Sequence, residues 1–249
     1  MDEIRIEADP TGAVRTITIN RPDKRNALSN AMFAALIEAF QETPADAERV
    51  TVIRSEGHVF CSGIDLKERL VHGAPPLDDL CVAIEQYPLP VVAVMQGDAI
   101  AGGAFLALFC DFVIAEEKAR FWVSLVQIGL APPWPLTRKL AELATLARAR
   151  EMVLLGDPIP AKRLADAHVI QAAVPEAELQ GEADRIITRL AQNAPLSLRA
   201  IKATLNAEAY ETVSNDNVVK MIHKARDSED GREGVKARLE RRMPVYGGR

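Results

Sequence analysis

The chain has 249 residues, of which 48% are hydrophobic, so it can bury the core of one large domain or two small ones. Its formal net charge of −5 argues against non-specific nucleic-acid binding, which needs a basic surface that releases phosphate counterions. The acidic start, Met1 to Arg5, has no apolar core, so we expect no secretory signal and a cytoplasmic protein.

Cysteine usage and hydropathy narrow the class of protein further. Cys61, Cys81 and Cys110 are odd in number and widely spaced, which favours free thiols over disulfides or a metal site. Residues 89–115 are mostly apolar, but prolines, glycines and aspartates divide them into pieces shorter than the roughly 18 to 20 residues of a membrane span. We therefore expect a soluble protein with neither a membrane nor a nucleic acid as partner.

The first half of the chain alternates strand and helix patterns. Residues 14–19 alternate in polarity and predict a strand, and Met32 to Phe40 contain apolar residues at helical spacing behind a capping Ser29 or Asn30. Further elements follow in the order strand, strand, helix and strand, at residues 51–53, 91–95, 102–109 and 112–114. Strands that alternate with helices indicate crossover units and an α/β sheet.

From about Pro135 onward, amphipathic helical patterns dominate. They cover residues 136–155, 176–205 and 217–242. The predicted organisation is an α/β core over residues 1–193 and a helical region over residues 194–249. A late helical block of this kind often packs on a neighbouring subunit.

Two glycine-bearing segments could carry chemistry. Residues 60–68 have Gly63 at a bend, and residues 96–104 contain Gly102 and Gly103. Each segment runs from a strand into a helix, whose first N–H groups are unpaired and can hold an anion or a polarised oxygen. Neither segment fits a phosphate loop or a dinucleotide fingerprint. Taken alone, each is better explained as an ordinary strand-to-helix turn.

Several motifs in order resemble one superfamily over nearly the whole chain. They are Asn20-Arg21-Pro22 with Asn26-Ala27-Leu28-Ser29, then Phe60 to Glu68, Pro90 to Gly103 with Cys110-Asp111, and finally Ser228 to Arg242 with Pro244. Together they resemble the crotonase, or enoyl-CoA hydratase/isomerase, superfamily. The resemblance implies a crotonase-like ββα-spiral core with a C-terminal helical trimerisation region, assembled as a homo-trimer or hexamer.

The resemblance also implies a binding site for an acyl-CoA thioester. The backbone N–H groups of Ile64 and Gly102 would form an oxyanion hole, which stabilises negative charge on the thioester carbonyl. Coenzyme A, the substrate carrier, would contact Lys24, Arg25, Ala27, Leu28, Ser62, Gly63, Asp65 and Leu66. No permanently bound cofactor and no metal are implied.

The catalytic positions of relatives hold apolar residues in this chain. The two hydratase glutamates correspond to Phe105 and Leu125, the carboxylate of some isomerases to Pro133, and the histidine of dehalogenase-like members to a position near Val82. With Trp134 nearby, these side chains predict an apolar acyl pocket, and none can transfer a proton. Ordinary two-glutamate hydration is therefore not supported.

Three functional hypotheses remain open. The first is a lyase or isomerase of this family with a non-standard acid/base, and the second is a non-catalytic acyl-CoA-binding protein. The third is an assembly subunit with a vestigial pocket, against which the intact glycine motifs argue. Groups that could replace the missing acids are Asp78, Asp79, Glu85, Asp98, His72 and Ser124, although each is better explained as a solvated or capping residue.

Overall fold

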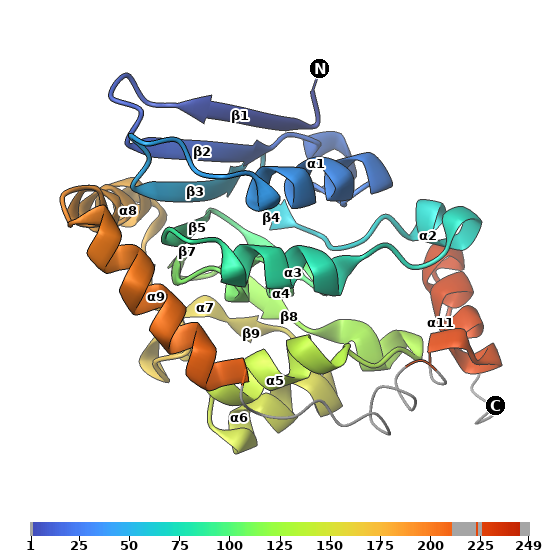
Figure 1. Cartoon of the computed structure of the whole chain (residues 1–249). Coiled ribbons are helices and arrows are strands. Elements are labelled where there is room, and N and C mark those ends of the chain that lie inside the picture. The colour runs from blue at the N-terminus through green and yellow to red at the C-terminus, as the bar shows by residue number, and fades with distance from the viewer. Residues whose placement is uncertain (1, 211–222, 224–225, 245–249) are drawn as a thin grey trace.

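Two β-sheets form the centre of the computed structural model, which describes residues 2–210, 223 and 226–244 (Figure 1). The larger sheet has the order β1 (Ile4–Ala8), β2 (Val14–Ile19), β3 (Val50–Ser55), β5 (Val91–Met95), β7 (Phe112–Glu116) and β10 (Ala172–Val174). Only β1 runs antiparallel to its neighbour there. The smaller sheet has the order β4 (Val59–Cys61), β6 (Asp98–Ile100), β8 (Arg120–Trp122) and β9 (Ile159–Pro160).

The chain visits the two sheets in turn and then forms helices. β3 and β4 precede α2 (Leu66–His72) and α3 (Leu77–Gln86), and β5 and β6 precede α4 (Gly102–Leu108). β7 and β8 precede η2 (Ser124–Ile128), α5 (Trp134–Leu143), α6 (Leu146–Arg150) and η3 (Glu151–Leu155). This repeated strand–strand–helix order is the ββα spiral, so the predicted fold class is confirmed.

Strand β5 illustrates why the central strands read as continuous apolar runs. All five of its residues are buried. Val91, Ala93 and Met95 join the cluster that contains α1 (Asn30–Gln41), α3 and α4, whereas Val92 and Val94 pack with α8 (Glu176–Ala191) on the opposite face. Because successive side chains alternate between faces, a parallel strand covered on both sides must be apolar at every position.

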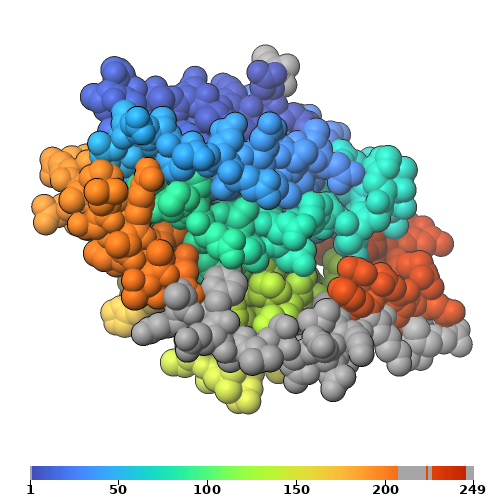
Figure 2. Space-filling model, in the orientation of Figure 1, coloured from blue at the N-terminus to red at the C-terminus, as the bar shows by residue number. Residues whose placement is uncertain are grey.

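The helical C-terminal region is present as α9 (Pro195–Tyr210) and α11 (Glu229–Glu240). Two short helices lie earlier in the chain, η1 (Pro22–Lys24) and α7 (Ala161–Asp166). Of the predicted helix over residues 217–242, the stretch with Val218 and Met221 lies outside the described residues. Helix α11 packs beside α2, far from it in sequence, and the space-filling view shows the two in contact (Figures 1 and 2). Within the described ranges, no helix is both long and apolar enough to cross a membrane.

Candidate functional site

Asn26 fixes the loop that precedes α1. Its backbone has a φ of 56°, a left-handed conformation that asparagine tolerates better than most residues. Its buried side-chain amide donates to the carbonyls of Glu56 and Val59, both at 2.7 Å, and accepts from the N–H of Arg21 at 2.9 Å. These bonds hold the loop against the turn between β3 and β4.

The loop then pairs with the first glycine-bearing segment. Leu28 forms a parallel bridge with Ile64, in which the Leu28 N–H donates to the Gly63 carbonyl at 2.7 Å and the Asp65 N–H to the Leu28 carbonyl at 2.9 Å. In this pairing the N–H of Ile64 points away from Leu28, and it donates to no backbone oxygen of the described chain. One donor is therefore left available.

Gly102 supplies a second such donor. It is the first residue of α4, so its N–H has no acceptor within the helix. The neighbouring Ala101 N–H donates to the Trp122 carbonyl at 2.7 Å, but the Gly102 N–H makes no backbone bond within the described ranges.

Glycines bring the two donors together. A Cβ at Gly63, whose φ is 90°, would lie 2.8 Å from the Ile100 carbonyl oxygen and 3.1 Å from the Gly102 nitrogen. A Cβ at Gly103 would lie only 2.2 Å from the Cys61 carbonyl oxygen. The two segments can therefore approach each other this closely only because glycine occupies both positions.

Ile64 and Gly102 both line one cavity of about 150 Å³. Most of its wall is apolar, from Leu66, Leu77, Ile100, Leu125, Ile128, Leu130, Ala131 and Pro133 among others. Its polar and charged lining residues are Ser62, Arg69, Asp78, Ser124, His223, Arg226 and Arg238. An apolar chamber with a few convergent polar groups is the usual form of a small-molecule site.

The predicted contact residues divide into two groups. Ser62, Ile64, Leu66, Gly102, Leu125 and Pro133 line the cavity. Lys24, Arg25, Ala27, Leu28, Gly63 and Asp65 do not line it but belong to the paired loop and segment next to it. The Asp65 carboxylate accepts from Arg21 Nη1 at 2.8 Å and from the Lys67 N–H at 3.0 Å, so it caps α2.

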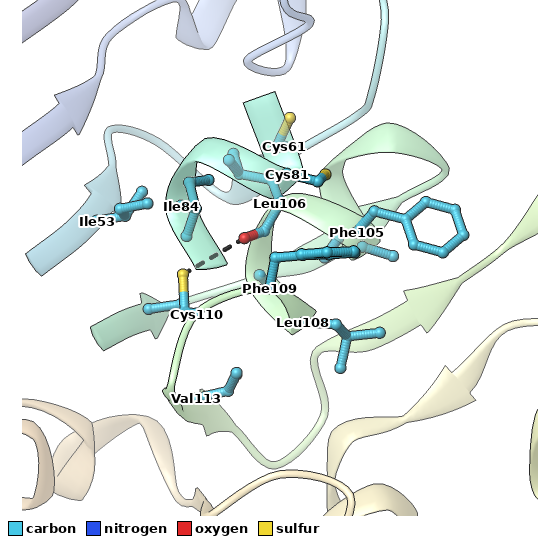
Figure 3. Close-up of a cluster of buried hydrophobic side chains, with 14 of the residues drawn as sticks. Ile53, Cys61, Cys81, Ile84, Phe105, Leu106, Leu108, Phe109, Cys110 and Val113 are labelled. Carbon is cyan, nitrogen blue, oxygen red and sulfur yellow. Dashed lines mark hydrogen bonds between the residues drawn. The ribbon is translucent and has the colours of Figure 1, made fainter. Parts of the chain in front are cut away.

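Three residues predicted for the acyl pocket, Val82, Phe105 and Trp134, do not line this cavity. Phe105 is fully buried among the core side chains, because α4 is enclosed on all sides beyond its two glycines (Figure 3). Val82 lines a separate hollow between α1 and α3. Trp134 is half-buried at the start of α5 and, unlike the adjacent Pro133, does not line the cavity.

Most of the groups considered as replacement acids are engaged away from the cavity. Asp98 pairs with Arg120, and Glu85 is buried against Arg138 and Lys139. Asp79 lines the separate hollow, and His72 is exposed at the end of α2. Asp78 and Ser124 do line the cavity.

Sequence reasoning missed the cationic wall of the cavity. Arg69 is half-buried on α2; burial lowers the pKa of its guanidinium, and the positive charge of Arg226 lowers it further. Arg226 itself pairs with Asp227 at 2.8 Å, which raises the pKa of Arg226 and lowers the pKa of Asp227. Arg238 lies over the Trp122 ring, 5.4 Å from its centroid. No local pattern could have indicated that residues so far apart in the chain share one wall.

Paired backbone donors at an apolar cavity define a site suited to a polarised carbonyl oxygen. The family model for enoyl-CoA hydratase/isomerase matches residues 9–249, and the chain belongs to this family. The resemblance read from the motifs is thereby confirmed.

Individual relatives agree with this assignment. The chain is 31% identical to 1,2-epoxyphenylacetyl-CoA isomerase of Escherichia coli, with 95% of each protein covered. It is 30% identical to 2,3-dehydroadipyl-CoA hydratase of the same organism, covering 95% of this chain and 96% of the relative. The structure of methylmalonyl-CoA decarboxylase complexed with 2S-carboxypropyl-CoA has the same fold, with a TM-score of 0.90 at 24% identity over 100% of this chain and 99% of that one.

Proposed function

We propose that the protein binds an acyl-CoA thioester and stabilises its enolate with the N–H groups of Ile64 and Gly102. The observation that carries this proposal is the pair of unpaired amides at one cavity. Two such donors stabilise a developing oxyanion by a few kcal/mol, since they are already oriented before the charge forms. Relatives whose names specify CoA thioesters support the substrate carrier.

The proposed coenzyme A surface runs from the Asn26 loop to the start of α2. Lys24 and Arg25 are exposed, and the Ser62 N–H donates to the Arg25 carbonyl at 3.1 Å, which ties their loop to the oxyanion segment. The two cations suit the nucleotide phosphates. Ala27, Leu28, Ser62, Gly63, Asp65 and Leu66 would complete this surface.

Asp78 is our candidate for the non-standard acid/base. It is the only carboxylate among the described residues that line the cavity. A carboxylate can remove the proton next to a thioester carbonyl if it lies within hydrogen-bonding reach of it. The resulting activity would be that of an isomerase or lyase without the two-glutamate addition of water.

A non-catalytic acyl-CoA-binding protein is the alternative function. Its support is the pair of apolar residues, Phe105 and Leu125, that the resemblance places at the positions of the hydratase glutamates. Neither side chain can transfer a proton, and both are buried. A cradle without proton-transferring groups would retain a thioester without changing it.

Mass spectrometry in D₂O separates these two functions. The protein is incubated with a panel of acyl- and enoyl-CoAs and measured under native and denaturing conditions. We expect deuterium uptake or a mass change in one thioester, and loss of that change in Asp78→Asn with native adducts retained. Native adducts without any chemical change would favour the binding protein, and the absence of adducts would contradict both functions.

Infrared spectroscopy tests the oxyanion hole directly. With butyryl-CoA labelled by ¹³C at its carbonyl, donation from Ile64 and Gly102 should lower the carbonyl stretching frequency on binding. The matched control is free butyryl-CoA in the same buffer. An unshifted band in the bound ligand would refute the assignment of these two amides.

The assembly also remains a proposal. We propose a cytoplasmic homo-trimer or hexamer, with the ββα-spiral core over residues 1–193 and the oligomerisation region over residues 194–249. Exposed apolar side chains of α9, such as Leu196 at 78% and Leu205 at 65%, support a covering subunit. Sedimentation equilibrium would measure the mass, and a concentration-independent monomer would contradict this assembly.

A further inference from the structure

Cationic side chains outnumber anionic ones among the described residues that line the cavity. Arg69, Arg226 and Arg238 line it, and Asp78 is the only carboxylate among its described lining residues. Arg226 is already paired with Asp227. Within the described part of the chain, Arg69 and Arg238 have no ion-pair partner.

Of these two cations, Arg69 has the less favourable electrostatic environment. It is half-buried, its pKa is lowered by burial and by the positive charge of Arg226, and the negative charge of Asp227 offsets only part of this lowering. A charge withdrawn from water without a partner costs free energy, and a neighbouring like charge adds to that cost. An anionic ligand group in the cavity would remove both costs at once.

Arg238 is held at the same cavity by the seating of α11. Its guanidinium lies over the Trp122 ring at 5.4 Å. A Cβ at Gly234 would lie 1.9 Å from the Ile128 carbonyl oxygen, so α11 contacts η2 backbone to backbone. This close seating allows α11, which lies beside α2 (Figure 1), to contribute a cation of the C-terminal region to the cavity lining.

The position of Arg69 distinguishes the acyl end of a ligand from its nucleotide end. Arg69 is the fourth residue of α2, which begins at Leu66, so its Cα lies roughly 4.5 Å along the helix axis from that of Leu66, two residues after the Ile64 donor. A cavity of about 150 Å³ is comparable with one that holds a benzene ring. This short distance and this small volume suit a short acyl group. The phosphates of coenzyme A lie beyond the pantetheine arm, on the other side of the thioester.

We propose that the acyl group of the substrate ends in a carboxylate, which Arg69 and Arg238 bind. This inference rests on the proposed function, since it assumes that the thioester carbonyl lies at Ile64 and Gly102. Guanidinium groups suit the role because their planar N–H donors match the two oxygens of a carboxylate.

The test compares two thioesters of equal chain length, glutaryl-CoA and pentanoyl-CoA, by titration calorimetry. The intact protein should bind glutaryl-CoA more tightly. Arg69→Gln and Arg238→Gln should each weaken glutaryl-CoA binding by about 10- to 100-fold, the size of a lost charge-assisted hydrogen bond, and pentanoyl-CoA binding by less than about 3-fold.

Arg232→Gln is the matched control. Arg232 is on α11, and its substitution removes the same charge. Its side chain does not line the cavity and donates to the Asp227 carbonyl. It should leave the preference for glutaryl-CoA intact. The midpoint of urea unfolding should not fall in Arg69→Gln, because the native side chain has no ion pair to lose and its half-buried charge costs free energy.

Three results would overturn the inference. Equal or tighter binding of pentanoyl-CoA by the intact protein would refute the preference for a terminal carboxylate, but it would leave the proposed function standing. Equal weakening of both ligands in Arg69→Gln would assign that arginine to the phosphates of coenzyme A. If neither thioester bound, the proposed function and this inference would fall together.

Discussion

At the scale of single residues, glycines decide whether the candidate site can exist. Gly103 lies against the Cys61 carbonyl and Gly63 against the Ile100 carbonyl, at distances that no other side chain permits. Gly102 is different, since a Cβ there would meet Leu77 and Ile64 at 3.4 to 3.5 Å, an ordinary contact distance. Adjacent glycines therefore serve different purposes, close packing at one position and an open cavity at the other.

Gly103→Ala and Gly102→Ala separate these purposes. We expect Gly103→Ala to lower the free energy of unfolding by about 2 to 3 kcal/mol, because its methyl group overlaps the Cys61 backbone. Gly102→Ala should change it by less than about 1 kcal/mol, since alanine favours the helix. Urea unfolding followed by circular dichroism measures both, and equal losses would contradict the packing argument.

The cysteines are expected to be chemically silent in the folded protein. Burial raises the pKa of Cys61 to about 12, and it raises the pKa of Cys81 and Cys110 as well (Figure 3). Because the thiolate is the reactive form, a thiol-specific reagent at pH 8 should modify none of the three in the native state and all three after unfolding. Rapid stoichiometric labelling of the native protein would contradict this expectation.

At the scale of an element, Asp65 joins α2 to the Asn26 loop. Burial alone would raise the pKa of Asp65, but bonds from Arg21, Glu68 and Lys67 outweigh it and the pKa is lowered. The same carboxylate begins the helix that carries Arg69 and follows the Ile64 donor. One side chain thus positions two parts of the candidate site.

Asp65→Asn tests the charge of this cap, since asparagine can still accept from the helix N–H groups. At pH 7 we expect a loss of about 1 kcal/mol in the free energy of unfolding, from the weakened Arg21 contact. Because the folded pKa is depressed, the native advantage is present above the usual aspartate pKa of about 4 and declines as the pH falls below it. Unfolding curves from pH 3 to 7 should therefore converge at low pH, whereas a constant gap would refute an ionic origin.

At the scale of the whole molecule, α9 is fastened to the core by one buried lysine. Lys202 is 7% exposed, and its Nζ donates to Asp111 Oδ2 at 2.6 Å and to the Leu89 carbonyl at 3.1 Å. Asp111 also accepts from the Val91 N–H at 2.7 Å, which connects the link to the central strand β5. The helical region is therefore coupled to the sheet by charge as well as by apolar contact.

Lys202→Met should lower the free energy of unfolding by about 2 to 4 kcal/mol, because it leaves Asp111 and two buried carbonyls without their cation. The matched control is Lys162→Met, which breaks an exposed pair with Asp166 and should cost less than about 0.5 kcal/mol. Thermal or urea unfolding of both variants measures the contrast. A similar small loss in each would indicate that apolar packing and the Asn206 hydrogen bond to the Glu85 carbonyl hold α9 without help from Lys202.

Local patterns determined much of the fold. The alternation in residues 14–19, the buried run at residues 91–95 and the Gly102 helix each fixed an element, because periodicity and capping act over a few neighbouring residues. The motifs likewise determined the family, and their glycines marked the two segments that meet at the cavity. Short strands such as β4 and β6 were not foreseen, since three residues carry too little pattern.

Only the tertiary structure decided what surrounds those segments. The resemblance predicts equivalent sites for Phe105 and Leu125, yet one is enclosed in the core and the other lines the cavity. Arg69 and Arg238 line the same cavity because α11 contacts α2 and η2, a contact between distant parts of the chain. The sequence by itself determined the α/β core through short-range patterns and the family through its motifs, whereas the set of arginines at the cavity arose from long-range packing that no local pattern encodes.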